Sequence, residues 1–147
     1  MVEDKLVIGL NGLKLAINTA EVAGIVSVTH PTYLPHQSGF VSGVISLRGE
    51  PVTVVDVRKA FNLQTVSGAR HIVVVVTDSK RTLGLDTGEA ETSFLWTEEL
   101  KQCVIKNDGG RFTNGTITLD AADYIIVNWH AMFDEAARLL KTEETHG

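Results

Sequence analysis

Short runs of apolar residues, some alternating with polar residues and some unbroken, recur along the whole chain between turn residues. Residues 13–17 alternate with a period of two, whereas residues 72–76 are apolar at every position, as in a buried central strand. Runs of about four to eight residues with these patterns are typical of strands. The expected strands cover residues 6–10, 13–17, 25–28, 44–47, 52–57, 71–77, 81–85, 100–106 and 124–127, and residues 111–119 contain a further hairpin signal.

Turn signals between these runs predict hairpins. The dipeptide Asn-Gly occurs at 11–12 and again at 114–115, and it is a strong signal for a two-residue hairpin turn. Residues 48–51 form another expected turn, in which Gly49 supplies a positive φ and Pro51 begins the returning strand. Residues 30–39 hold two of the three prolines and are expected to form a loop.

One segment has the period of a helix. Within residues 129–141 the apolar residues fall on one helical face, and most charged residues lie off it. Short helical turns are expected at 18–23 and 58–61, and a frayed polar tail at 142–147. Residues 86–99 are acidic and mixed, with Phe94, Leu95 and Trp96 as their expected apolar anchors. The predicted fold class is therefore all-β, with a C-terminal helix and short helical turns.

Two pairs of segments resemble each other in the same chain order. Residues 52–61 resemble residues 124–133, and residues 16–21 resemble residues 84–89. The similarity predicts two lobes of about 70 residues with one strand plan, a size at which all-β lobes often close into barrels. Asp56 and Asn128 occupy equivalent strand-to-helix junctions, where an Asx side chain caps the following turn, so we expect both to be capping residues.

Composition bounds the partners and the location. The 147 residues are 44% hydrophobic, which is enough for one domain or two small lobes with a core. The net charge of −5, without a basic cluster, argues against nucleic acid or an anionic membrane as a partner. No apolar run reaches the about 18 residues of a membrane-spanning helix, and the N-terminus is unlike a signal peptide. We therefore expect a cytoplasmic protein without membrane insertion.

The sequence holds few candidates for chemistry. Cys103 is the single cysteine, which rules out an internal disulfide and favours a structural thiol. His30 and His36 share a loop but lack a third ligand at suitable spacing, so we expect no metal site. No nucleophile elbow, P-loop or zinc-protease motif is present, and we expect neither catalysis nor a cofactor. A small ligand- or metal-binding barrel enzyme that uses His30, His36 and Cys103 is the alternative.

The hairpin within residues 40–63 places Arg48 at its turn. Two interpretations of Arg48 follow from turn chemistry, and the sequence leaves both open. The guanidinium group either faces a partner protein or clamps carbonyl groups of its own chain, because arginine suits both interface ion pairs and packing.

This hairpin resembles the signature hairpin of the CheW family, the adaptor proteins of bacterial chemotaxis. The matching positions are Gly43, Val44, Ile45, Leu47, Arg48, Gly49, Val52, Val54, Val55, Asp56, Val57 and Arg58. The resemblance implies a CheW-like domain over residues 2–141, built from two packed five-stranded SH3-like barrels. It also implies a non-catalytic adaptor that couples a chemoreceptor tip to the regulatory domain of the histidine kinase CheA.

Carried over by position, the resemblance implies partner-binding roles for Val22, Gly43, Leu47, Arg48 and Gly49. The expected arrangement has the helical receptor tip in an apolar groove between the barrels, near Val22, and a barrel similar to CheW in the kinase docked outside. Two positions depart from the family pattern, with Gly24 in place of an acidic residue and Asn128 in place of an aspartate. These departures leave room for an adaptor of a non-chemotactic pathway, such as a pilus or biofilm pathway.

Overall fold

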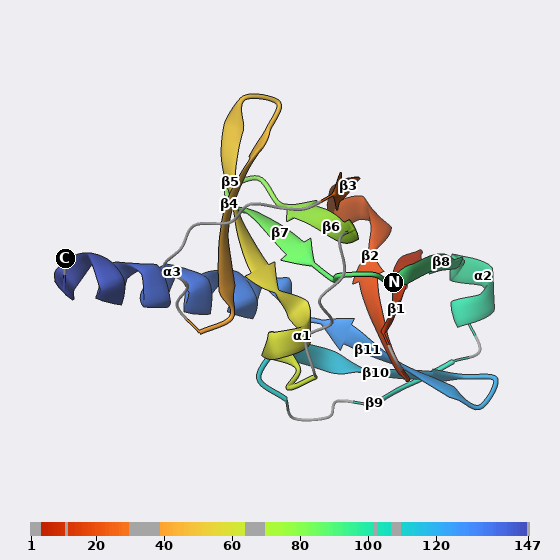
Figure 1. The fold of residues 1–147 in the computed structure, drawn as a ribbon. Helices are drawn as coiled ribbons and strands as arrows, with labels where there is room; N and C mark the ends of the chain where they lie inside the picture. Colours follow the sequence, from red (N-terminus) through yellow and green to blue (C-terminus); the bar gives the residue numbers. More distant parts are fainter. Residues whose placement is uncertain are drawn as a thin grey trace. The chain divides into compact units, whose positions relative to one another are not determined.

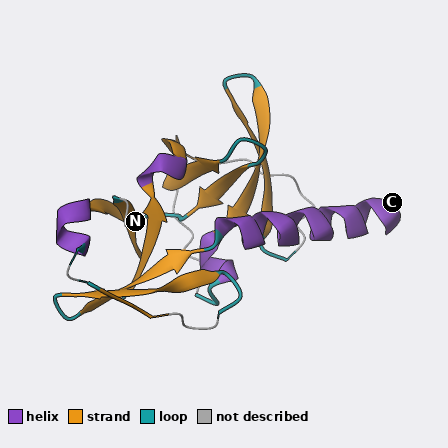
Figure 2. Ribbon diagram, turned by 180° about the vertical axis from the view of Figure 1, so that it is seen from behind, coloured by secondary structure: helices purple, strands orange, loops and turns teal. Residues whose placement is uncertain are grey.

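The computed structural model describes residues 4–10, 12–29, 39–63, 70–101, 103–106 and 110–146 of the chain. Strands dominate it, and α3 is its one long helix (Figures 1 and 2). The strands are β1 (Lys5–Leu10), β2 (Leu13–Asn18), β3 (Val22–Thr29), β4 (Val41–Leu47), β5 (Glu50–Asp56), β6 (Arg70–Thr77), β7 (Thr82–Asp86), β8 (Glu91–Leu95), β9 (Val104–Lys106), β10 (Thr113–Leu119) and β11 (Ala122–Val127). The helices are the 3-10 helix η1 (Thr19–Glu21), α1 (Val57–Ala60), α2 (Thr97–Leu100) and α3 (Trp129–His146).

The chain forms two compact units, and each is discontinuous in sequence. Unit 1 comprises Met1–Val22 and Ala90–Asn128, and unit 2 comprises Ala23–Glu89 and Trp129–Gly147. The sheet of unit 1 has the order β8-β1-β2-β11-β10-β9, and the sheet of unit 2 has the order β3-β6-β7-β5-β4. The predicted mainly-β fold class is confirmed. The first sheet exceeds the expected five strands by β9, and closure of each sheet into a barrel stays a prediction.

The two sheets share one strand plan. In unit 1 the hairpin β1–β2 pairs through β2 in parallel with β11, which pairs antiparallel with β10. In unit 2 the hairpin β6–β7 pairs through β7 in parallel with β5, which pairs antiparallel with β4. The parallel registers also correspond, since Ile126 lies opposite Ala16 and Val54 lies opposite Gly84. The two pairs correspond through the separations of the similar sequence segments. Ile126 follows Val54 by 72 residues, and Gly84 follows Ala16 by 68 residues.

Backbone hydrogen bonds outside the ladders follow the same two offsets. They fix the points at which the chain leaves a strand, and a buried N–H or carbonyl group requires such a partner. The equivalent bonds are Asp56 N to Phe40 O (2.7 Å) with Asn128 N to Phe112 O (2.8 Å), and Thr87 N to Ile72 O (2.9 Å) with Thr19 N to Asp4 O (3.0 Å).

The second Asn-Gly dipeptide is not a turn, which corrects the prediction for 114–115. Gly115 lies inside β10 with φ +125°, where the pairing register with β11 shifts. Gly43 occupies the equivalent shift in β4, with φ +151°. The actual turn follows at Asp120 and Ala121, with φ values of +50° and +63°. Glycine serves both a bulge and a turn, so the dipeptide alone does not distinguish them.

The segment between β7 and β10 differs most from expectation. Residues 91–95 form the unpredicted strand β8, and the predicted strand 100–106 is reduced to β9 because α2 occupies Thr97–Leu100. The carboxylate of Glu99 accepts a hydrogen bond from the backbone N–H of Trp96 (3.1 Å), which stabilises this short helix. Of the three expected apolar anchors only Leu95 is buried, whereas Phe94 and Trp96 are 47% and 53% exposed.

Each unit has its own buried apolar residues. In unit 1 a core cluster consists of Val7, Leu95, Leu100 and Ile117, and Cys103 packs against it half-buried. In unit 2 the four consecutive valines 73–76 of β6 are completely buried, and β6 lies between β3 and β7. The run that is apolar on both faces is therefore an interior strand, as predicted.

Helix α3 keeps the predicted apolar face and is longer than expected. Met132 and Ala136 are buried, and Phe133 and Leu140 are half-buried. Residues 142–146 continue the helix to His146, so the expectation of a frayed tail is wrong for them. Glu143 and Glu144 are good helix formers, which favours this extension.

Asp78, in the turn between β6 and β7, joins that turn to α3. Its carboxylate accepts hydrogen bonds from the backbone N–H groups of Lys80 (2.8 Å) and Arg81 (2.7 Å). Nε2 of His130 lies 3.0 Å from the other oxygen. The bond from Lys80 does most to lower the pKa of Asp78 from 3.8 to about 2, against the opposing effect of partial burial and with help from Arg81 and His130.

The lowered pKa predicts an acid-sensitive contribution to stability. A carboxylate with a folded-state pKa below its unfolded value stabilises the fold above the unfolded pKa, and the gain is lost as the pH falls toward the folded pKa. We expect Asp78→Asn to lose stability at pH 6 and to approach wild type between pH 4 and pH 2, in urea unfolding at several pH values. Asp134→Asn, a change at a carboxylate 72% exposed, is the control. Parallel pH profiles for wild type and Asp78→Asn would contradict this role.

Candidate partner-binding site

The turn between β4 and β5 has a tight geometry that is unusual for its sequence. Leu47 pairs with Glu50, which leaves a two-residue loop of Arg48 and Gly49 with φ values of +51° and +81°. Positive φ at both positions is the geometry of a type I′ turn, which favours Asn-Gly. A left-handed arginine costs about 1 kcal/mol, so a feature other than local stability favours Arg48 here.

The guanidinium group of Arg48 has neither a hydrogen bond nor an ion pair with any residue that the structure describes. The clamp that the sequence allowed for Arg48 is instead made by Arg58, at the other end of β5. Arg58 is 3% exposed, and its Nε and Nη2 donate to the carbonyl oxygens of Thr87 (3.0 Å) and Glu89 (2.7 Å). The two arginines of one hairpin stretch therefore have opposite surroundings.

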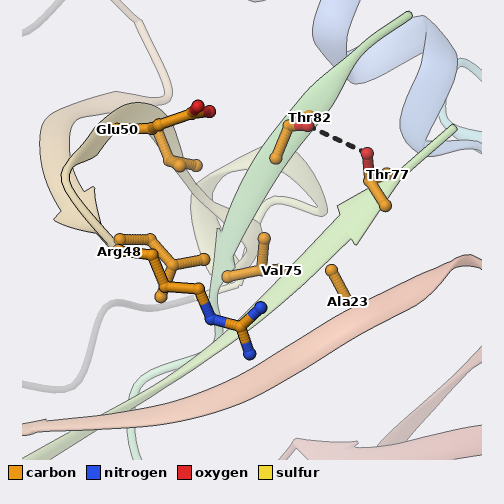
Figure 3. A pocket seen from close by; sticks show the side chains of 8 residues that line it. Ala23, Arg48, Glu50, Val75, Thr77 and Thr82 are labelled. Atoms are coloured by element: carbon orange, nitrogen blue, oxygen red, sulfur yellow. Dashed lines mark hydrogen bonds between the residues drawn. The ribbon is translucent and has the colours of Figure 1, made fainter. Parts of the chain in front are cut away.

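A hollow of about 310 Å³ lies beside Arg48 within unit 2, and we call it the Arg48 pocket. The side chains that line it come from β3, from the β4–β5 hairpin and from β6 and β7, and Figure 3 shows them from close by. Val75 and Val52 are buried, Leu47 is half-buried, and Ala23 is exposed. The lining residues are Ala23, Leu47, Arg48, Glu50, Val52, Val75, Thr77 and Thr82.

The polar groups of the Arg48 pocket differ in what they offer a ligand. The hydroxyl of Thr77 donates to the carbonyl oxygen of Arg81 (2.9 Å) and lies 2.9 Å from the hydroxyl of Thr82. Because a hydroxyl has one hydrogen, Thr82 donates to Thr77 and neither retains a free donor. Figure 3 shows the carboxylate of Glu50 pointing away from the guanidinium of Arg48. The unused donors of the pocket are thus those of Arg48.

The structure brings only some of the predicted site residues together. Leu47 and Arg48 line the pocket, and Gly49 completes the turn. Gly43 lies in the bulge of β4 and does not line the pocket, and Val22 begins β3 half-buried, one residue before the lining residue Ala23.

The two capping residues differ in what the structure describes. Oδ1 of Asp56 accepts a hydrogen bond from the backbone N–H of Lys59 (3.1 Å) at the start of α1. Asn128 directly precedes α3, and its backbone N–H is bonded to Phe112. Capping by the Asn128 side chain stays a prediction.

Several surface features escaped the sequence. The walls of the Arg48 pocket from β6 and β7 carry no local signal, because Val75, Thr77 and Thr82 look like ordinary strand residues. The sequence predicts Phe94 and Trp96 as apolar anchors, yet their exposed rings stack with centroids 5.3 Å apart where the edge strand β8 ends and α2 begins. Both rings are exposed, so neither serves as the core anchor that the sequence predicts.

The alternative with His30, His36 and Cys103 gains no support. Both histidines lie outside the described residues, and Cys103 packs against the core cluster of unit 1. Among the described residues, no three of the His, Cys, Asp and Glu side chains gather as metal ligands. None of the helices in the described ranges has the length and apolar character required to cross a membrane.

Comparison with known proteins gives one consistent family. Residues 4–137 match the family model described as "CheW-like domain". The chain is 25% identical over 126 residues to the probable chemotaxis protein CheW of Rhizobium etli, covering 83% of this chain and 81% of the relative. It is 33% identical over 79 residues to the chemotaxis protein CheW of Bacillus subtilis, covering 52% and 51%. The crystal structure of the scaffolding protein TtCheW from Thermoanaerobacter tengcongensis shares the fold, with a TM-score of 0.69, 20% identity, and coverage of 86% and 89%.

Proposed function

Because the chain belongs to the family of CheW-like domains, whose members are non-catalytic scaffolds, we propose that it couples chemoreceptors to a CheA-type histidine kinase in the cytoplasm. The observation that carries the proposal is the family match, together with an exposed arginine at the rim of the Arg48 pocket that bonds to none of the described residues. We take residues 2–141 as the domain, since the matched residues 4–137 fall within this range.

Two surfaces would divide the work. In this proposal the Arg48 pocket and the turn that carries it dock the kinase domain that is similar to CheW. The start of β3, at Val22, contacts the helical tip of a receptor, which presents an apolar stripe to it. Each contact has an affinity on the order of 1 µM, or about 8 kcal/mol, and an array of many copies strengthens the sum.

Gly24 supports a second candidate, an adaptor of a pilus- or biofilm-type pathway. An atom at the Cβ position of Gly24 would meet nothing within 4 Å, so the glycine is not required by packing. Packing therefore does not explain why glycine replaces the expected acidic residue at this position. A different partner protein would explain it. Binding of the chain to kinases and receptors of both kinds of pathway, measured side by side, would decide between the two candidates.

Replacing Arg48 with alanine should weaken kinase binding about tenfold or more, because a charge-assisted contact in an interface is worth about 1.5–3 kcal/mol. Arg48 has no hydrogen bond or ion pair with the residues that the structure describes, so the urea midpoint should stay nearly unchanged. Isothermal titration of a full-length CheA-type kinase measures the first effect. Lys59→Ala, at an exposed cation on α1, is the matched control and should bind as wild type. Equal binding by Arg48→Ala and wild type would remove Arg48 from the site.

A further inference from the structure

We propose that the Arg48 pocket accepts a short partner segment in which an apolar side chain is followed by a carboxylate. The apolar side chain contacts Leu47 and Ala23, and the carboxylate binds the guanidinium group of Arg48. This inference rests on the proposed function, because it gives the chemistry that the kinase presents at the same surface. The argument has an apolar part and an ionic part.

The apolar part follows from the walls of the pocket. Val75 and Val52 are buried and form the floor of the pocket, and the half-buried Leu47 and the exposed Ala23 supply its accessible aliphatic surface. A volume of about 310 Å³ lies at the lower limit for ligand pockets and corresponds to about ten water molecules. The space therefore suits one or two side chains of a protein and is small for a cofactor.

The ionic part follows from the donors of Arg48. The hydroxyls of Thr77 and Thr82 are already engaged, and Arg48 bonds to none of the described residues. A guanidinium group beside apolar walls pairs best with a planar carboxylate, to which it donates two parallel hydrogen bonds. The two-residue turn limits the freedom of Arg48, so less entropy is lost when it binds.

The surroundings favour a single carboxylate over a polyanion. Among the described residues that line the pocket, Arg48 is the one cation, and Glu50 adds a negative charge. The whole chain has a net charge of −5, which repels nucleic acid and phosphate clusters. One carboxylate beside an apolar side chain is the anionic ligand that remains.

No carboxylate of the described residues binds the guanidinium group of Arg48. Figure 3 shows the guanidinium group on the side of the pocket where Ala23 of β3 lies. Ala23 is exposed and lines the pocket, so a longer side chain fits there without disturbing the core. Ala23→Glu would place a carboxylate of the chain near Arg48, whereas Ala23→Gln has nearly the same size without the charge.

Two capped dipeptides, leucyl-aspartate and its amide analogue leucyl-asparagine, test the pocket by NMR titration of the full chain. We expect binding on the order of 1 mM for the acid and at least fivefold weaker binding for the amide, with shifts at Arg48 Nε–H and the Leu47 methyl groups. Ala23→Glu should abolish the preference for the acid, and Ala23→Gln should keep it. Equal affinities for the two dipeptides, or equal behaviour of the two variants, would overturn the inference.

Titration of the full-length kinase separates the two proposals. If wild type binds the kinase and Ala23→Glu binds it at least tenfold more weakly than Ala23→Gln, both proposals are supported. If wild type binds and both variants match it, coupling to the kinase stands, whereas the inference and the docking role of the Arg48 pocket both fail. If wild type does not bind the kinase yet prefers the acidic dipeptide, the proposed function fails, and the inferred preference of the pocket for a carboxylate is supported.

Discussion

Truncating Arg58 to alanine should lower the free energy of unfolding by about 3 kcal/mol. The side chain is 3% exposed and donates to the carbonyl oxygens of Thr87 and Glu89, which flank Gly88. Gly88 has φ +67°, and a Cβ there would lie 3.1 Å from Nε of Arg58, so guanidinium and backbone are closely packed. Without Arg58 the two carbonyls lose a charged donor. Nη1 of Arg58 is buried without a hydrogen-bond partner among the described residues, which reduces the net stability that the side chain contributes.

Urea unfolding followed by circular dichroism measures this loss. Arg58→Lys keeps the charge but can satisfy only one of the two carbonyl groups well, so it should cost about half as much as alanine. Lys59→Ala, at the adjacent exposed residue, should change stability by less than about 0.5 kcal/mol. A loss below about 1 kcal/mol for Arg58→Ala would mean that water replaces the guanidinium group at low cost.

Truncating Trp129 to alanine should cost about 4 kcal/mol, the largest effect that we expect from one side chain. Trp129 is 1% exposed and begins α3, and it is the largest of the fully buried side chains among the described residues. Its ring lies 3.9 Å from that of His130, measured between centroids. Removing it leaves a cavity at the base of the helix and should loosen α3 together with the bond from His130 to Asp78.

The second tryptophan of the chain is a natural control. Trp96 is 53% exposed, so Trp96→Ala should cost less than about 1 kcal/mol. Each variant retains a single tryptophan, so fluorescence reports the remaining one directly. We expect a blue-shifted emission from Trp96→Ala, in which Trp129 remains, and a red-shifted emission from Trp129→Ala. A stable Trp129→Ala variant with native urea midpoint would show that the helix is held elsewhere.

Arg48 and Arg58 show why residue type alone does not assign a role. Both belong to the hairpin that carries the family resemblance, and both appear in the sequence as charged residues next to β-branched runs. The structure buries one against backbone carbonyls and leaves the other exposed beside a pocket. We therefore expect Arg58 variants to fail by unfolding and Arg48 variants to fail by losing a partner.

The sequence by itself determined the strand content, the long helix and most tight turns, because these depend on neighbours within a few residues. The two pairs of similar sequence segments are separated by 72 and 68 residues, and the same separations relate the paired residues of one sheet to those of the other. The prediction of a turn at 114–115 is wrong because a bulge and a turn both favour glycine for its positive φ. Phe94 and Trp96 were misread because their burial depends on which strand ends the sheet.

Only the tertiary structure decided that Arg58 is a clamp and that Arg48 lies exposed beside a pocket. The bonds of Arg58 join residues 29 and 31 positions apart, and the pocket beside Arg48 gathers side chains from β3, β5, β6 and β7. No periodicity encodes such encounters, because they arise when separate strands pair and bring distant side chains together. The different surroundings of Arg48 and Arg58 are thus a consequence of how the strands pair.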